Sequence, residues 1–107
     1  MNKRQLILPL VVTAALGASV LPAGAASTIK LKDNLFAPKS TTVSKGTTVT
    51  FRWTGKAPHN VTVTKGPVKF HSKTQVKGTY KYRFAKAGTY KIVCTIHPGM
   101  NLTVRVK

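Results

Sequence analysis

The sequence predicts an all-β domain, a small antiparallel β-sandwich, and three observations support this fold class. Apolar residues alternate with polar ones over short segments after residue 28, as in strands with one buried face. Turn-forming residues separate these segments, and no segment has the apolar period of a helix. Apolar inner faces with lysine- and threonine-rich outer faces are typical of two packed sheets.

The elements follow from this alternation in chain order. Ile29 and Leu31 alternate with lysines, and residues 48–53 alternate threonine and arginine with valine, phenylalanine and tryptophan. Further alternating segments cover residues 61–64, 80–84, 90–92 and 102–107. The expected turns lie at Lys45-Gly46, Thr54-Gly55-Lys56, Lys65-Gly66-Pro67, Lys77-Gly78 and Ala87-Gly88.

The first 26 residues have the features of a secretory signal peptide. Lys3 and Arg4 precede an apolar stretch over residues 6–20, and Ala23-Gly24-Ala25 fits the cleavage pattern. The stretch is short for a membrane-spanning helix, which is the alternative interpretation. We therefore expect residues 1–26 to direct export to the periplasm or the cell exterior, and residues 27–107 to form one domain.

The expected mature domain is strongly basic and contains one cysteine, Cys94. Its only acidic residue is Asp33, and with 16 lysines and arginines the net charge is about +15. Such a charge attracts anionic partners, although most of the lysines fit solvated outer sheet faces. One cysteine cannot form an internal disulfide, so a bound metal would supply the stabilisation that small exported domains often take from disulfides.

A cysteine, two histidines and a methionine are expected to gather at strand ends. Cys94, His59 and Met100 each continue the alternation of the strand segment next to them in sequence, in phase with its apolar positions. Their side chains should therefore face the interior. His97 lies in the loop between Cys94 and Met100. A thiolate, two imidazoles and a weak axial thioether are the donors of a blue-copper centre. The alternative is a buried thiol beside unrelated histidines, which leaves a free cysteine in an oxidising compartment.

Two segments carry a resemblance to a known family. Pro58–Val61 (PHNV) and Gly88–Met100 (GTYKIVCTIHPGM) resemble the cupredoxins, specifically the plastocyanin-, amicyanin- and pseudoazurin-like blue copper proteins. Asp33–Trp53 is also similar to the first strands of that family. The resemblance implies a Greek-key sandwich with one copper ion, held by His59, Cys94, His97 and Met100. The chain departs from the family at Leu102, where glycine is usual, and in a compact interval between His59 and Cys94.

The resemblance also implies roles for neighbouring residues. Asn60 would hold the ligand loops and bond the cysteine sulfur, and Pro98 would shape the loop. His97 would bring one edge near the surface as the electron port, inside an apolar rim that includes Pro58 and Ile96. We expect a monomer that docks transiently near His97 with an acidic redox protein or envelope oxidoreductase. His71 has no matching ligand position and is interpreted as a surface histidine.

The preferred function is therefore electron transfer by Cu(I)/Cu(II) cycling, and two alternatives stay open. One is copper carriage or buffering in the envelope without redox turnover. The other is a cationic protein that associates with an anionic membrane surface or envelope polymer. An enzyme is not expected, because the chain has no His-x-His pair for a second copper site and no pair of carboxylates. Export argues against nucleic-acid binding, because charge alone is not a readout surface.

Overall fold

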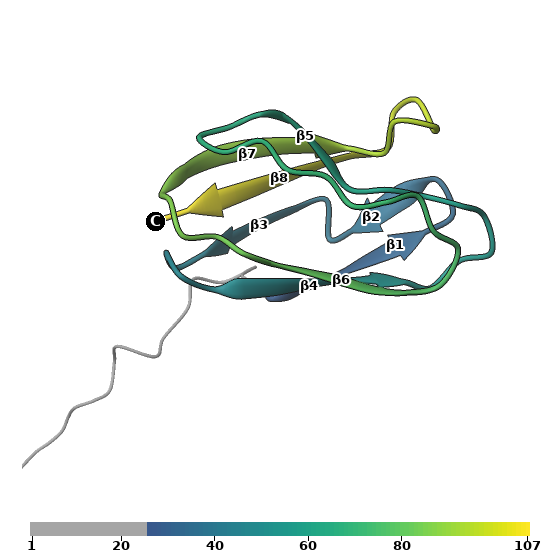
Figure 1. Cartoon of the computed structure of the whole chain (residues 1–107), viewed down its shortest axis with the longest axis horizontal. Coiled ribbons are helices and arrows are strands. Elements are labelled where there is room, and N and C mark those ends of the chain that lie inside the picture. The colour runs from purple at the N-terminus through teal and green to yellow at the C-terminus, as the bar shows by residue number, and fades with distance from the viewer. Residues whose placement is uncertain (1–25) are drawn as a thin grey trace, which may run out of the picture.

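The computed structural model describes residues 26–107, which form two packed β-sheets without a helix (Figure 1). The predicted signal peptide, except for its last residue, lies outside the described residues. Within residues 26–107, no helical segment is suited to crossing a membrane. The eight strands are β1 (Thr28–Lys32), β2 (Leu35–Ala37), β3 (Ser40–Val43), β4 (Thr48–Trp53), β5 (Thr62–Lys65), β6 (Gly78–Arg83), β7 (Gly88–Val93) and β8 (Asn101–Val106).

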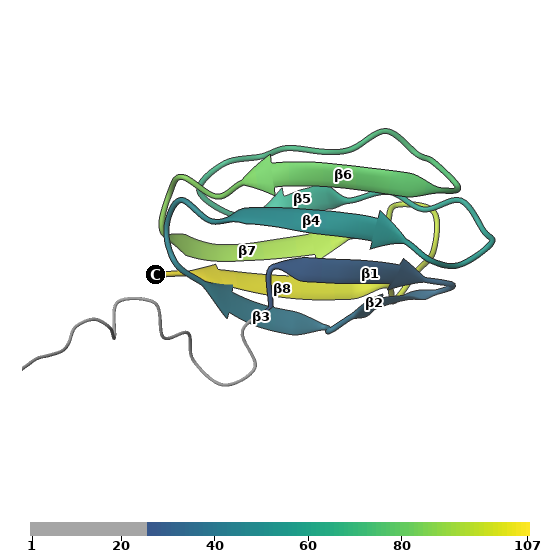
Figure 2. The same cartoon turned by 90° about the horizontal axis from the view of Figure 1, so that it is seen from below.

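Each sheet contains four strands, and the chain crosses repeatedly between the two layers (Figure 2). One sheet has the order β2-β1-β4-β6 and the other has the order β3-β8-β7-β5. The predicted alternation is confirmed, since apolar positions are buried and the intervening lysines and arginines are exposed. The largest fully buried apolar side chains are Tyr90, Phe36, Phe51, Phe84, Ile29, Leu31, Ile92, Met100 and Leu102.

Two strand pairings differ from the antiparallel arrangement expected from the sequence. β1 pairs with β4 in parallel, with Leu31 opposite Trp53, and β3 pairs with β8 in parallel. The other four pairings are antiparallel. Alternation identifies the buried face of a strand, but it carries no information on the direction of its neighbour. The alternation also failed to single out β2 and β3, which are only three and four residues long.

The parallel pairing of β1 with β4 determines which connections meet. Both strands end at the same edge of their sheet, so the turn after β1 lies beside the connection that follows β4 (Figure 2). The loop between β7 and β8 lies at this end too, opposite the C-terminus (Figure 1). Three segments that are distant in sequence are thus brought together at one end of the sandwich.

Candidate metal centre

The loop between β7 and β8 carries three of the predicted site residues on a short hairpin. Val93 and Asn101 are the last paired residues of the ladder, and the Cys94 N–H extends it by donating to the Met100 carbonyl at 3.1 Å. Inside the loop, the Met100 N–H donates to the His97 carbonyl at 3.2 Å. Gly99 has φ +84°, a conformation that glycine adopts without a steric penalty. The backbone therefore fixes where Cys94 and Met100 leave the strands.

His59 reaches the same end from the connection between β4 and β5. Its backbone N–H and carbonyl form a reciprocal pair of hydrogen bonds with Gln75, both 3.0 Å long. The carbonyl also accepts a 3.0 Å hydrogen bond from the indole Nε1 of Trp53. The side chain is fully buried, as predicted from its alternation in phase with Val61 and Val63. The backbone contacts leave His59 little freedom to move away from the loop that carries Cys94.

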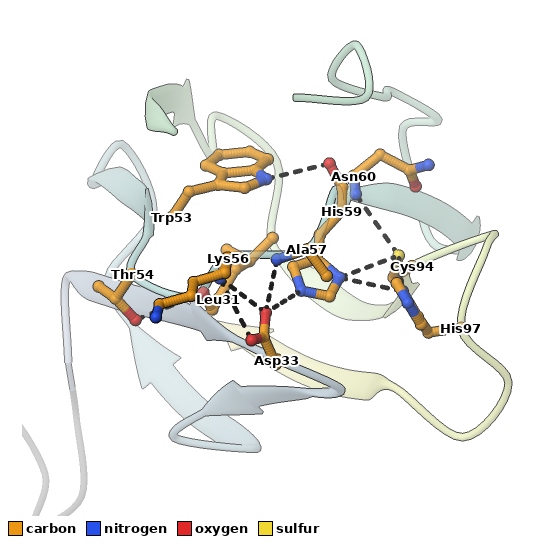
Figure 3. A network of polar contacts seen from close by, with 10 residues as sticks. All are labelled: Leu31, Asp33, Trp53, Thr54, Lys56, Ala57, His59, Asn60, Cys94 and His97. Carbon is orange, nitrogen blue, oxygen red and sulfur yellow. Dashed lines mark hydrogen bonds and ion pairs between the residues drawn. The ribbon is translucent and has the colours of Figure 1, made fainter. Parts of the chain in front are cut away.

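The thiol and the two imidazoles converge on a single point (Figure 3). The two Nδ1 atoms of His59 and His97 are 3.0 Å apart. The Cys94 sulfur lies 3.9 Å from Nδ1 of His59 and 3.7 Å from Nδ1 of His97. The point equidistant from the three atoms is about 2.1 Å from each of them, close to the length of a metal–imidazole bond. The spacing of the three donors therefore suits one metal ion, and they form the one such cluster among residues 26–107.

Asn60 joins the two halves of this site. Its backbone N–H points at the Cys94 sulfur, with 3.5 Å between nitrogen and sulfur. Its amide nitrogen donates to the hydroxyls of Thr74 at 3.0 Å and Thr95 at 2.8 Å. Its amide oxygen accepts from the Thr95 N–H at 3.1 Å and from the Thr62 hydroxyl at 2.9 Å. The buried amide thus uses its full hydrogen-bonding capacity to tie β5 and the 71–75 segment to the cysteine loop.

The remaining site residues predicted from the sequence occupy distinct environments. Met100 is buried within the core, whereas Pro98 is exposed in the loop. His97 is partly exposed, while His59 and Cys94 are buried. Ile96 and Pro58 are exposed, as expected for an apolar rim. His71 is exposed and outside the cluster, as predicted for a surface histidine.

Asp33, which lies in the turn after β1, is not among the site residues predicted from the sequence. Its Oδ1 is 3.2 Å from Nε2 of His59, and the carboxylate accepts hydrogen bonds from the backbone N–H groups of Lys56 and Ala57 (Figure 3). The hydrogen bond from Ala57, followed by the one from His59, holds the pKa of the Asp33 carboxyl below its usual value. The signal in the sequence was its isolation, because it is the only acidic residue of the chain.

The chain is similar to copper proteins in sequence and in fold. A family model described as copper-binding proteins of the plastocyanin/azurin family matches residues 23–107. The chain is 33% identical over 108 residues to amicyanin-alpha of Methylorubrum extorquens, covering 89% of this chain and 87% of that protein.

Solved structures show the same relationship. A reduced mutant form of amicyanin superposes with a TM-score of 0.68 at 30% identity, over 84% of this chain and 88% of that chain. A Cu-containing nitrite reductase from Thermus scotoductus SA-01 superposes with a TM-score of 0.70 at 28% identity, over 94% of this chain. The chain spans only 25% of that reductase, so the likeness to it concerns one part of a larger protein.

Proposed function

Because the chain belongs to the plastocyanin/azurin family of copper-binding proteins, we propose that it is an exported blue copper protein that carries single electrons between redox partners. The family and the Cys94 cluster identify copper as its cofactor. One observation carries the proposal: a thiol and two imidazole nitrogens at one end of a β-sandwich each lie about 2.1 Å from a common point, which is the length of a metal–imidazole bond.

Each ligand has a distinct part in this proposal. His59, Cys94 and His97 would hold the copper ion, and Met100 would contribute the weak axial thioether. Bound copper would supply the Cu(I)/Cu(II) couple. The protein would hold the donors in a geometry between the preferences of the two oxidation states, so that little rearrangement accompanies electron transfer. The backbone bonds of His59, Cys94 and Met100 support this role, because they restrain the donors before any metal binds.

His97 is the proposed electron port. It is the partly exposed member of the cluster, and the exposed side chains of Pro58, Ile96 and Pro98 come from the same end of the sandwich. Val76 adds a further exposed apolar side chain next to Gln75, which pairs with His59. An apolar surface of this kind suits brief contact with a redox partner.

Exposed lysines at the same end would orient an acidic partner. Lys56 follows the end of β4, while Lys73 and Lys77 flank the segment that pairs with His59. We expect the triple change of these three lysines to glutamine to slow electron transfer to an acidic cytochrome at low salt, and the difference to fade at high salt. The matched control changes Lys30, Arg52 and Lys81 to glutamine, which removes the same charge from an outer sheet face. Equal rates for both variants would refute oriented docking at this end.

Electron carriage and copper buffering differ in a measurable property. A carrier keeps its metal through repeated oxidation and reduction, whereas a buffer releases it to a chelator in one of the two states. Cyclic voltammetry of the copper-loaded protein should show a reversible one-electron wave, and a Cu(I) chelator present during cycling should not diminish it. Loss of the wave with transfer of Cu(I) to the chelator would favour the buffer.

The proposal includes export, a monomeric state and no enzymatic activity of its own. The N-terminal pattern of residues 1–26 supports export, and sequencing of the mature N-terminus should find it within a residue or two of Ser27. Size-exclusion chromatography should give the mass of one domain. The reductase resemblance provides the test of activity: reduced protein mixed with nitrite should not be reoxidised faster than a nitrite-free control.

A second candidate function rests on the outer face of the β2-β1-β4-β6 sheet. Lys30, Lys32 and Arg52 are exposed there, with Lys30 directly opposite Arg52, and β6 adds Lys81 and Arg83. Like charges on neighbouring strands oppose folding, so an anionic surface against this face would be stabilising. Neutralising Lys30, Arg52 and Lys81 should weaken sedimentation with phosphatidylserine vesicles more than neutralising Lys56, Lys73 and Lys77. Equal weakening would mean that only the overall charge matters.

A further inference from the structure

The single acidic residue of the chain contacts the His59 ring on the side opposite Cys94 and His97. Oδ1 of Asp33 lies 3.2 Å from Nε2 of His59, while Nδ1 of the same ring faces Cys94 and His97. In a chain with 18 basic residues, the carboxylate has many other cations available. Among the described residues, the one side chain to which it instead makes a hydrogen bond is a buried imidazole (Figure 3).

Two backbone N–H groups hold this carboxylate in place, and a third backbone bond holds the neighbouring turns together. Asp33 accepts hydrogen bonds from the backbone N–H of Lys56 at 3.0 Å and from that of Ala57 at 2.9 Å. The parallel ladder of β1 and β4 continues into the turns, where the N–H of Thr54 donates to the Leu31 carbonyl at 2.9 Å. Each of these contacts is independent of a metal ion.

Gly55 leaves the space that the carboxylate needs. A Cβ atom at this position would collide with the Asp33 side chain and would approach its backbone nitrogen to 2.8 Å. The turn after β4 is therefore shaped around Asp33. The neighbouring turn and its two backbone N–H groups therefore hold the aspartate beside His59.

The orientation of the His59 ring has a chemical consequence. A metal at Nδ1 requires that nitrogen to be free of its proton, which leaves Nε2 as the donor to the carboxylate. A carboxylate that accepts this hydrogen bond fixes the tautomer and the ring plane, and it makes the imidazole a stronger donor to the metal. A negative charge close to the ring also favours the more positive oxidation state of a bound ion.

We propose that Asp33 is a positioning residue for His59, which sets the imidazole tautomer and lowers the reduction potential of the copper site. This inference rests on the proposed function, because it takes His59 to be a copper ligand. It adds a residue from the β1–β2 turn, outside the segments that carry the ligands. The carboxylate side chain is 46% exposed, so solvent screens its charge and the effect on the potential is moderate.

The test compares Asp33→Asn with the wild-type chain. The asparagine is similar in shape, and its carbonyl oxygen can still accept from the backbone N–H groups and, more weakly, from Nε2 of His59, but it carries no charge. We expect Asp33→Asn to weaken Cu(II) binding relative to Cu(I) by up to about tenfold, which raises the potential by up to about 59 mV for one electron. The control Ser44→Lys makes the same change of net charge in the turn between β3 and β4, at the opposite end of the sandwich. It should leave the potential unchanged.

A second measurement needs no metal. Nitrogen NMR of the metal-free protein should show His59 with its proton on Nε2, and this preference should weaken in Asp33→Asn but not in Ser44→Lys. An unchanged potential and an unchanged tautomer in a folded Asp33→Asn variant would overturn the proposal and leave Asp33 as a turn-stabilising residue only.

The two proposals fail in different ways. If the wild-type protein forms no blue copper site, the proposed function is refuted and the effect on the potential falls with it. If the site forms but Asp33→Asn has the same reduction potential and the same His59 tautomer as the wild type, only the proposed role of Asp33 is refuted.

Discussion

Replacing Asn60 with alanine should cost the domain much of its stability. The side-chain amide makes four hydrogen bonds, two as a donor to Thr74 and Thr95 and two as an acceptor from Thr95 and Thr62. A typical hydrogen bond contributes about 0.5–1.5 kcal/mol net, so the four together would contribute about 2–6 kcal/mol. The hydroxyls of Thr74 and Thr95 belong to exposed residues and can bond to water instead. We therefore expect a loss of about 2–4 kcal/mol.

Urea unfolding followed by tryptophan fluorescence measures this loss, because Trp53 is buried and its indole bonds to His59. Metal-free and copper-loaded protein should both be measured, because the more stable form allows a larger loss of stability to be determined. Asn101→Ala is the control, since Asn101 is exposed at the start of β8 and its replacement should change stability by about 0.5 kcal/mol or less.

The outcome separates two roles of Asn60. The hydrogen bond to the Cys94 sulfur comes from the backbone N–H, which alanine retains. A folded Asn60→Ala variant should therefore still bind copper through Cys94, with reduced stability. A loss below about 1 kcal/mol would refute the reasoning, because it would mean that hydrogen bonds to water replace the four side-chain bonds with almost no loss of stability.

Three further predictions concern other parts of the molecule. Burial raises the pKa of the Tyr90 hydroxyl above its usual value of 10.0, so its contribution to stability is complete below about pH 10 and is lost as the pH rises towards the folded-state pKa. Tyr90→Phe removes the 2.8 Å hydrogen bond to the Lys86 carbonyl, which should cost about 0.5–1.5 kcal/mol at pH 8. The gap to wild type should narrow towards pH 11, and a constant gap in urea unfolding would contradict this. Gly55→Ala should destabilise the domain by about 1–3 kcal/mol because its Cβ collides with Asp33, and an unaffected thermal midpoint would contradict the tight approach of the two turns. Copper at 100 times its dissociation constant should raise the free energy of unfolding by about 2.7 kcal/mol in the wild type. Calorimetry of Cys94→Ser at the same copper concentration should find no such increase in stability. An equal increase in Cys94→Ser would mean that the metal binds elsewhere.

The burial of three of the predicted site residues could be predicted from the sequence. Alternation follows directly from burial of one face of a strand, so the phases of Cys94, His59 and Met100 predicted their buried positions. The short interval from Cys94 to Met100 predicted a tight loop, because a hairpin of that length leaves its ends paired.

The contribution of Asp33 could not be predicted in this way. Its contact with His59 depends on the parallel pairing of β1 with β4, which brings two turns together that are more than 20 residues apart in sequence. Side-chain alternation is the same in parallel and antiparallel strands, so it does not reveal which strand ends meet. The hydrogen bonds from Lys56 and Ala57 are made by backbone N–H groups, which every non-proline residue carries.

The most direct test of the copper site is to add Cu(II) to the domain formed by residues 27–107 and to record visible absorption and EPR spectra. We expect an intense blue thiolate-to-copper band with a narrow copper hyperfine splitting. This signal should vanish in Cys94→Ser and persist in His71→Ala, whose histidine lies outside the cluster. A colourless protein with ordinary Cu(II) signals, or an intense band that survives in Cys94→Ser, would contradict the account.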